Sequence, residues 1–125
     1  MRASTTRTHL YHHLLALLQD HDVLALPSAQ VWPFERSLAW PKVIVTLNGT
    51  RAMDTYHRWM EVVTPGTLSG CPVISLPVGF DARGLPMGMQ IIGRPRDDLS
   101  VLQLTHLYES LSPFLRMAPP ALRMD

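Results

Sequence analysis

The sequence predicts an α/β protein with a small mixed sheet of about three to four strands and about three helices. Two apolar runs of strand length, Val73–Val78 and Met87–Ile92, are separated by a short loop that glycines bound. Two longer segments, residues 7–19 and 99–111, repeat leucine at helical spacing. Both runs are apolar almost throughout, as in strands that are covered on both faces. Such strands need helices on both sides, which predicts a layered α/β arrangement.

The first half of the chain begins with an amphipathic helix from about Arg7 to Gln19. A short apolar strand, Val23–Leu26, follows and ends at Pro27, which cannot donate a hydrogen bond to a neighbouring strand. Residues 27–42 then predict an extended surface loop rather than a flexible linker, because large aromatic side chains punctuate it: Trp32, Phe34 and Trp40.

The middle of the chain leaves one choice open. Val43–Leu47 is rich in β-branched residues and precedes Asn48-Gly49, a turn signal, so it is either a strand or a direct lead into the next helix. That helix is predicted from Arg51 to about Val63, where Pro65 ends it. Residues 67–70 then predict a short turn or helical cap.

The two apolar runs carry two informative residues. Gly88 lies inside the last strand, which predicts a bulge or the close approach of another backbone. Gln90 is the only polar side chain in that strand, so if it is buried it must find hydrogen-bond partners.

The last predicted helix is amphipathic and is stopped by Pro113, after which residues 113–125 predict a tail. At 125 residues, the whole of 1–125 predicts a single domain. Three helices cover a small sheet only partly, so we expect an uncovered apolar surface. A second copy of the chain or a separate partner would cover this surface, and we favour a homo-oligomer.

Composition limits the possible functions. Hydrophobic residues make up 46% of the chain and charged residues 17%, and the formal net charge is +1. This balance gives no argument for a nucleic-acid partner. A single cysteine excludes an internal disulfide and suits a reducing compartment, and no apolar run approaches the length of a membrane span. We therefore expect a cytoplasmic protein that binds neither nucleic acid nor membrane, and we expect no cofactor.

Two groups of polar side chains on predicted helices admit two interpretations each. His9, His12 and His13 have a spacing that could bring two imidazoles to one metal ion, but a solvent-facing row opposite the leucines is favoured. Asp54, His57 and Glu61 share one helical face, and this row could act in acid–base catalysis or form weak ion pairs with solvent around it; ion pairing is favoured.

Two further features are weighed in the same way. Cys71 could be a nucleophile, but that role requires a histidine partner, and a small buried residue is the favoured interpretation. Arg94 and Arg96 could cradle a phosphate, but the loop that contains them lacks a glycine-rich pattern. No catalytic residue and no metal ligand is predicted for this chain.

The glycine and proline pattern of residues 64–93 resembles the amidase signature family. Members of that family carry a run close to L-A-G-x-P-x-x-x-x-P-x-G-F, then G-L-P-x-G-x-Q-x-I-G, then a helix that ends in an acidic residue. The matching residues here are Leu68–Pro72, Pro77–Phe80, Gly84–Gln90, Ile92-Gly93 and Tyr108-Glu109. Upstream, the segments that look like further parts of the family pattern are Asp22–Ala29 and Tyr56–Met60.

The resemblance implies a part of a larger α/β/α fold whose members hydrolyse linear amide C–N bonds. In that family a Gly/Ser-rich loop, G-G-S-S-G-G, supplies two catalytic serines, and a lysine far upstream acts as the base. These 125 residues contain no such loop, and their only lysine is Lys42, which does not match the catalytic lysine. The resemblance therefore implies the C-terminal portion of an amidase without the catalytic Ser-Ser-Lys residues, which is not expected to be active alone.

The resemblance also assigns a role to part of the chain. It implies that the end of the predicted second helix and the turn after it face the acyl-binding space, with the substrate-binding residues Trp59, Met60, Glu61, Thr64 and Cys71. Trp59 and Met60 suggest an apolar or aromatic substrate group on a small-molecule amide. The partner would be an N-terminal amidase half or a second copy of the chain. The alternative is a stand-alone, non-catalytic interaction or scaffold domain.

Overall fold

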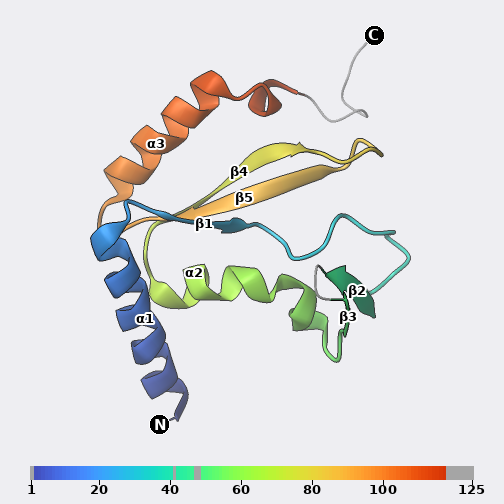
Figure 1. Ribbon diagram of the computed structural model, residues 1–125, viewed down its shortest axis with the longest axis horizontal. Coiled ribbons are helices and arrows are strands. Elements are labelled where there is room, and N and C mark those ends of the chain that lie inside the picture. The colour runs from blue at the N-terminus through green and yellow to red at the C-terminus, as the bar shows by residue number, and fades with distance from the viewer. Residues whose placement is uncertain (1, 41, 47–48, 118–125) are drawn as a thin grey trace.

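Figure 1 shows the computed structural model of the chain, which describes residues 2–40, 42–46 and 49–117. The helices are α1 (Arg2–Asp20), α2 (Thr64–Ser69) and α3 (Asp98–Leu111), and two 3-10 helices are η1 (Tyr56–Val63) and η2 (Phe114–Arg116). The strands are β1 (Leu24–Pro27), β2 (Val43–Thr46), β3 (Gly49–Ala52), β4 (Val73–Phe80) and β5 (Pro86–Ile92). The predicted α/β class, with three α-helices around a three-stranded sheet, is confirmed.

The main sheet has the strand order β1-β5-β4, and both of its strand pairs are antiparallel. The predicted mixed sheet is therefore corrected for the described residues. The short connection between β4 and β5 explains their pairing, because a parallel pair needs a crossover of a dozen residues or more. The two central apolar runs are β4 and β5, as predicted, with a register shift between Pro77 and Gly79.

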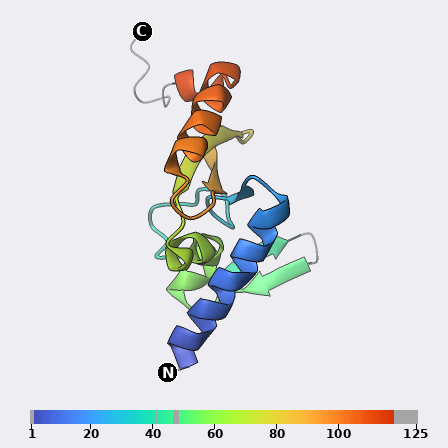
Figure 2. The ribbon, with the colours of Figure 1, turned by 90° about the vertical axis from the view of Figure 1, so that its left-hand side faces the viewer.

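The sheet lies between two helical layers (Figure 1). Helix α3 covers one face, and η1 and α2 cover the other, where α1 packs against α2 at one end of the sheet. Figure 2 shows the same separation from the side, with the β2–β3 hairpin on the α2 side of the sheet.

The core is centred on the carboxyl end of β5. Ile92 is fully buried and Ile91 is 4% exposed, and the buried Val101 of α3 reaches them across Gly93. A Cβ atom on Gly93 would collide with the Val101 side chain, so glycine is required where α3 approaches the strand. On the other side, Leu14 and Leu18 are the buried residues of α1.

The predicted helix from Arg51 to Val63 is wrong in its first half. Residues 49–52 form β3, which pairs with β2 and settles the open choice for Val43–Leu47 in favour of a strand, while Leu47 and Asn48 lie outside the described residues. Only the second half is helical, as the 3-10 helix η1. Pro65 does not end a helix; it lies in the first turn of α2, where its missing N–H costs nothing.

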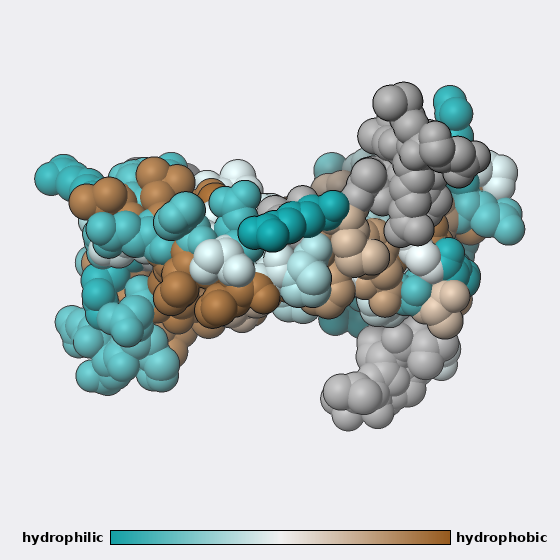
Figure 3. Space-filling view, turned by 90° about the horizontal axis from the view of Figure 1, so that it is seen from above, coloured by the Kyte–Doolittle hydropathy of each residue, from teal (hydrophilic) through white to brown (hydrophobic). Residues whose placement is uncertain are grey.

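Helix α3 has the predicted bounds but not the predicted amphipathic face. Its leucines lie on several sides of the helix, and four of them are more than half exposed: Leu99, Leu102, Leu107 and Leu111. Figure 3, seen from the α3 side, shows hydrophobic side chains among polar ones on this face. The predicted uncovered apolar surface was one that the helices leave on the sheet, and these leucines of α3 do not test it; we call these four residues the α3 leucine surface. Within the predicted tail, η2 packs on β4, where Phe114 lies edge-on to Phe80; residues 118–125 lie outside the described part.

No helix among the described residues combines the length and the apolar character that crossing a lipid bilayer requires.

Candidate functional site

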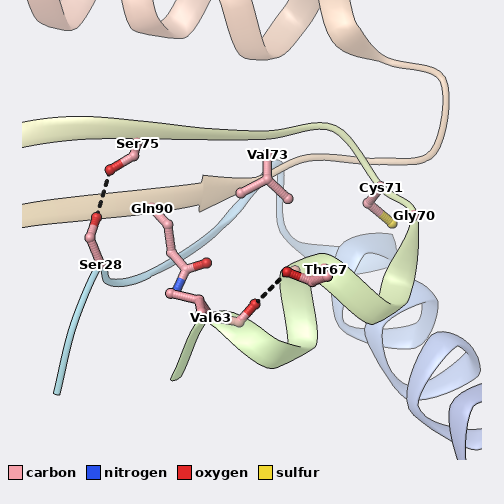
Figure 4. Close-up of a pocket in the computed structure, with 9 residues that line it drawn as sticks. Ser28, Val63, Thr67, Gly70, Cys71, Val73, Ser75 and Gln90 are labelled. Carbon is pink, nitrogen blue, oxygen red and sulfur yellow. Dashed lines mark hydrogen bonds between the residues drawn. The ribbon is translucent and has the colours of Figure 1, made fainter. Parts of the chain in front are cut away.

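A cleft of about 510 Å³ opens between α2 and the main sheet, and we call it the Gln90 cleft. The helix side supplies Gly66, Thr67 and Gly70, while the strands supply Val73, Ser75 and Gln90 (Figure 4). Most of these residues belong to the segment whose glycine and proline pattern is family-specific. The fold therefore gathers the signature segment around one cavity.

Gln90 joins three elements at the floor of this cleft. Its side chain is 3% exposed, and its amide Nε2 donates hydrogen bonds to the carbonyl oxygens of Pro27 and Val62, each at 2.9 Å. The expectation that a buried Gln90 finds partners is thus confirmed. Its carbonyl oxygen points the other way, towards α2 (Figure 4), and lies 3.3 Å from the place that a Cβ atom on Gly66 would occupy. Glycine at position 66 leaves room for this acceptor on the cleft side.

Two serine side chains, one just after β1 and one on β4, meet across β5 next to Gln90. The Ser28 and Ser75 hydroxyl oxygens are 2.7 Å apart and share a hydrogen bond, and the Ser28 N–H donates to the carbonyl oxygen of Gly88 at 2.8 Å. A Cβ atom on Gly88 would lie 2.8 Å from the Ser28 hydroxyl oxygen and 3.3 Å from the Leu76 carbonyl oxygen. The predicted close approach at Gly88 is confirmed, and it is what lets Ser28 reach Ser75.

Cys71 lies at the end of the cleft, directly after the left-handed Gly70 that terminates α2 with φ of 68°. Cys71 is 8% exposed, so the favoured interpretation of a small buried residue is confirmed. Its backbone N–H donates to the Ser69 hydroxyl, which in turn donates to the Gly66 carbonyl oxygen. None of the described residues that line the Gln90 cleft is a histidine, lysine or carboxylate, so the cleft offers hydrogen bonds and apolar contact but no base for a nucleophile.

A second cleft, of about 340 Å³, lies beside the first, and we call it the Trp59 cleft. The Trp59 ring meets Phe34 edge-to-face at 5.5 Å between centroids and Tyr56 at 5.9 Å. These contacts explain how aromatic residues hold the loop after β1 against η1. Ser28 lines both clefts, and the other residues of the Trp59 cleft are mainly apolar, among them Trp32, Pro86 and Met87.

The predicted substrate-binding residues are thus distributed over two clefts. Cys71 lines the Gln90 cleft and Trp59 the Trp59 cleft, whereas Met60, Glu61 and Thr64 line neither. Sequence reasoning missed Ser28, Ser75 and Gly66. Ser28 lies in the segment Asp22–Ala29 that resembles the family pattern. Its approach to Ser75 depends on strand pairing that the sequence did not specify.

The predicted row of Asp54, His57 and Glu61 does not lie on one helix, because Asp54 precedes η1; Arg58 instead pairs with both carboxylates. Its guanidinium lies 2.7 Å from the Asp54 carboxylate and 2.5 Å from that of Glu61. The hydrogen bond from Arg58 lowers the pKa of Asp54 below its ordinary value. The favoured ion-pair interpretation is confirmed for Asp54 and Glu61, which both pair with Arg58, whereas His57 forms no ion pair with the described residues.

The histidines of α1 and Arg94 of the loop after β5 have solvent-exposed or structural positions. His9, His12 and His13 are exposed on α1, and among residues 2–40, 42–46 and 49–117 no group of three or more metal-binding side chains comes together. The guanidinium of Arg94 donates to the carbonyl oxygens of Leu18 and His21, so it anchors the end of α1.

Comparison with known proteins agrees with this geometry. The model of the Amidase family matches residues 1–102. A glutamyl-tRNA(Gln) amidotransferase subunit from Brevibacillus brevis is 32% identical over 124 residues, covering 98% of this chain and 23% of the relative. A fatty acid amide hydrolase from Medicago truncatula is 31% identical over 111 residues, covering 87% of this chain and 17% of the relative.

A solved structure gives the same result. The crystal structure of a glutamyl-tRNA(Gln) amidotransferase subunit from Thermotoga maritima matches with a TM-score of 0.68 and 28% identity, over 90% of this chain and 22% of the other. The chain thus spans less than a quarter of the length of these relatives. With the family model matching residues 1–102 of the chain, and with Gly70, Cys71 and Gln90 of the signature stretches lining one cleft, the chain belongs to the amidase family.

Proposed function

We propose that this chain is the C-terminal segment of an amidase, that it forms one wall of the substrate pocket, and that it does not hydrolyse amides alone. The observation that carries the proposal is the composition of the Gln90 cleft. Residues of the segment 64–93 from α2, β4 and β5 surround it, yet it holds no nucleophile–base pair among its described lining residues. The catalytic Ser-Ser-Lys residues would then come from another part of the enzyme, facing this cleft.

The substrate would be a small-molecule amide with an apolar or aromatic group. Its amide end would lie over the Gln90 cleft, where the Gln90 carbonyl oxygen and the two serine hydroxyls supply hydrogen-bonding atoms. Its apolar end would lie in the Trp59 cleft, which Ser28 joins to the first. This arrangement keeps Trp59 and Cys71 as proposed substrate-binding residues. Met60, Glu61 and Thr64 line neither cleft and are given no substrate contact in this proposal, which a variant of Thr64 tests below.

A chimera tests the proposal. The matching segment of the Medicago truncatula fatty acid amide hydrolase would be replaced by this chain, so that the host supplies the catalytic residues. We expect hydrolysis of a fatty acid amide by the chimera and none by the chain alone. If the chimera folds but does not hydrolyse the amide, the chain is better described as a non-catalytic interaction domain; if the chain alone is active, the proposed division of the site is wrong.

A matched pair of variants in the chimera locates the pocket. Thr67 is an exposed residue of α2 that lines the Gln90 cleft, and Thr64 is an exposed residue of the same helix that does not. We expect Thr67→Trp to raise the KM strongly because the indole fills the cleft, and Thr64→Trp to have little effect. Equal effects of the two variants would remove the Gln90 cleft from the substrate pocket, and a loss with Thr64→Trp alone would restore the sequence prediction for Thr64.

The α3 leucine surface is the proposed site of association. Exposed groups of large apolar side chains often mark association sites, and four leucines of α3 are more than half exposed. In isolation we expect a homo-oligomer through this surface, and in the complete enzyme we expect the N-terminal amidase half to cover it. Sedimentation velocity over a range of concentrations should show self-association that Leu102→Gln reduces and Leu38→Gln, in an exposed loop, does not. A monomer at all concentrations would exclude the homo-oligomer.

The proposed compartment is the cytoplasm. The support is chemical: the chain has one cysteine, which is buried and free, as suits a reducing compartment.

A further inference from the structure

A third cleft lies on the far side of Gly70 from the Gln90 cleft, and we call it the Arg96 cleft. It measures about 420 Å³ and lies between the first half of α1, the end of α2 and the loop that joins β5 to α3. Its lining includes two arginines, Arg7 and Arg96, with the hydroxyl-bearing Ser4 and Tyr11. No carboxylate is found among its described lining residues, so the charge of the cleft is positive.

Arg7 is held at the cleft by a structural hydrogen bond. Its Nε donates to the carbonyl oxygen of Leu68 at 2.8 Å, at the end of α2 where helix carbonyls lack intrahelical partners. This bond uses only one of the five guanidinium N–H groups. The terminal nitrogens of Arg7 make no hydrogen bond or ion pair with the described residues, so they are available to a ligand.

Arg96 adopts a backbone conformation that arginine rarely takes. Its φ is +65°, and among the described residues it is the only non-glycine residue with positive φ. Arg94 to Asp97 form a turn, closed by a hydrogen bond of 3.1 Å from the Asp97 N–H to the Arg94 carbonyl oxygen, with Pro95 and Arg96 at its centre. Type II turns place a positive φ at this second central position and favour glycine there. Strain that a chain retains in this way is a reason to ask what the side chain does.

Arg58, Arg83 and Arg94 each form an ion pair with a carboxylate. Arg7 and Arg96 line one cleft together, and neither is paired with a carboxylate of the described residues. Among the described arginines, Arg2, Arg36, Arg51 and Arg116 also lack a carboxylate partner, so it is the shared cleft that sets Arg7 and Arg96 apart. Guanidinium groups bind carboxylate and phosphate oxygens with two parallel hydrogen bonds, so two of them on one cleft match a ligand with several anionic oxygens.

We propose that the Arg96 cleft binds a multivalent oxyanion, such as the phosphate groups or the paired carboxylates of a small molecule. The site is separate from the Gln90 cleft and needs no catalytic residue, so it stands whether or not the proposed amidase function is correct. Because Gly70 lines both clefts, a ligand here would contact the turn that ends α2 and carries Cys71.

Calorimetric titration of the full chain at low ionic strength tests this proposal, with inorganic pyrophosphate as the probe and succinate at equal ionic strength as a second arm. We expect saturable one-site binding of pyrophosphate that weakens about tenfold or more in Arg7→Gln and in Arg96→Gln, since a lost hydrogen bond to a charged group has that effect. Arg83→Gln removes the same charge from a distant loop and should leave the affinity nearly unchanged. Stronger succinate binding would identify carboxylates as the ligand class, weaker succinate binding would identify phosphates, and equal binding would show that the cleft accepts both oxyanions.

Arg96→Gly separates a ligand role from a structural one. Glycine adopts positive φ without strain, so this variant should unfold at a higher temperature than the parent while losing pyrophosphate affinity. If Arg96→Gly or Arg7→Gln binds pyrophosphate as the parent does, or if the losses are no greater than in Arg83→Gln, the proposal is overturned. Absence of saturable binding to the folded parent chain also overturns it.

Discussion

Replacement of Gln90 by glutamate should destabilise the chain strongly at neutral pH. The two side chains have nearly the same shape, but the ionised carboxylate is only an acceptor, whereas Gln90 donates to the carbonyl oxygens of Pro27 and Val62. Gln90→Glu therefore places an anionic oxygen against two carbonyl oxygens in a site that is 3% exposed. The contacts that it breaks join β5 to the end of β1 and to η1.

The magnitude follows from the number of orphaned groups. A buried acceptor that loses its donor costs about 1–3 kcal/mol, so two carbonyl oxygens cost about 2–6 kcal/mol together. Domains of this size unfold with about 5–15 kcal/mol in total, so the loss is a large part of the stability. Gln90→Leu shares the loss of both donors but adds no charge, and it should be less damaging than Gln90→Glu at pH 8.

The glutamate variant should also acquire a pH dependence that the parent lacks. Burial and the two facing carbonyl oxygens raise the folded-state pKa of the introduced carboxyl above its unfolded value of about 4.3. The folded state then binds more protons than the unfolded state between these two pKa values. Stability is fully present below about pH 4.3 and falls by about 1.4 kcal/mol per pH unit until the raised pKa is passed.

Urea unfolding followed by circular dichroism measures these effects at pH 5 and pH 8. The control is Gln103→Glu, the same change on an exposed position of α3, which should shift the unfolding free energy by less than about 0.5 kcal/mol. If Gln90→Glu is as stable as Gln103→Glu at pH 8, Gln90 does not bridge the two carbonyl oxygens in solution. If its stability does not rise between pH 8 and pH 5, the facing carbonyls do not perturb the introduced carboxyl.

Two further predictions concern the contact between Gly88 and Ser28 and the turn between β4 and β5. Gly88→Ala should cost about 1–3 kcal/mol because its Cβ would lie 2.8 Å from the Ser28 hydroxyl oxygen, and Ser28→Ala should recover part of that loss in a double-mutant cycle; strictly additive losses would contradict the contact. Burial raises the pKa of Asp81, but hydrogen bonds from the backbone N–H of Leu85 and from Arg83 together lower it by more. The net pKa is therefore below its ordinary value. Asp81 therefore stabilises the β4–β5 turn above pH of about 4 and loses that contribution as the pH falls through its lowered pKa. The melting-temperature difference between the parent and Asp81→Asn should shrink from about pH 7 to about pH 2.5. A constant difference would argue against the turn hydrogen bonds.

The positions of the candidate site were only partly predictable. Gln90 and Gly88 could be singled out because a lone amide and a lone glycine stand out in an apolar strand. Trp59 and Cys71 line two neighbouring clefts that share Ser28, and their predicted contact with a substrate stays a prediction. Arg96 gave no sign of strain in the sequence, because only the turn geometry reveals its positive φ.

Local chemistry alone determined β4, β5 and the bounds of α3, because apolar runs, glycines and Pro113 fix where such elements begin and end. It also determined the family, because the order of glycines and prolines reflects backbone positions that few sequences share. Only the tertiary structure decided what crosses between elements: the β2–β3 hairpin in place of a helix, the antiparallel register that brings Ser28 to Ser75, and the two carbonyl oxygens that Gln90 joins. These features depend on pairing between distant segments, and a sequence pattern records the propensity of each segment but not the partner that it finds.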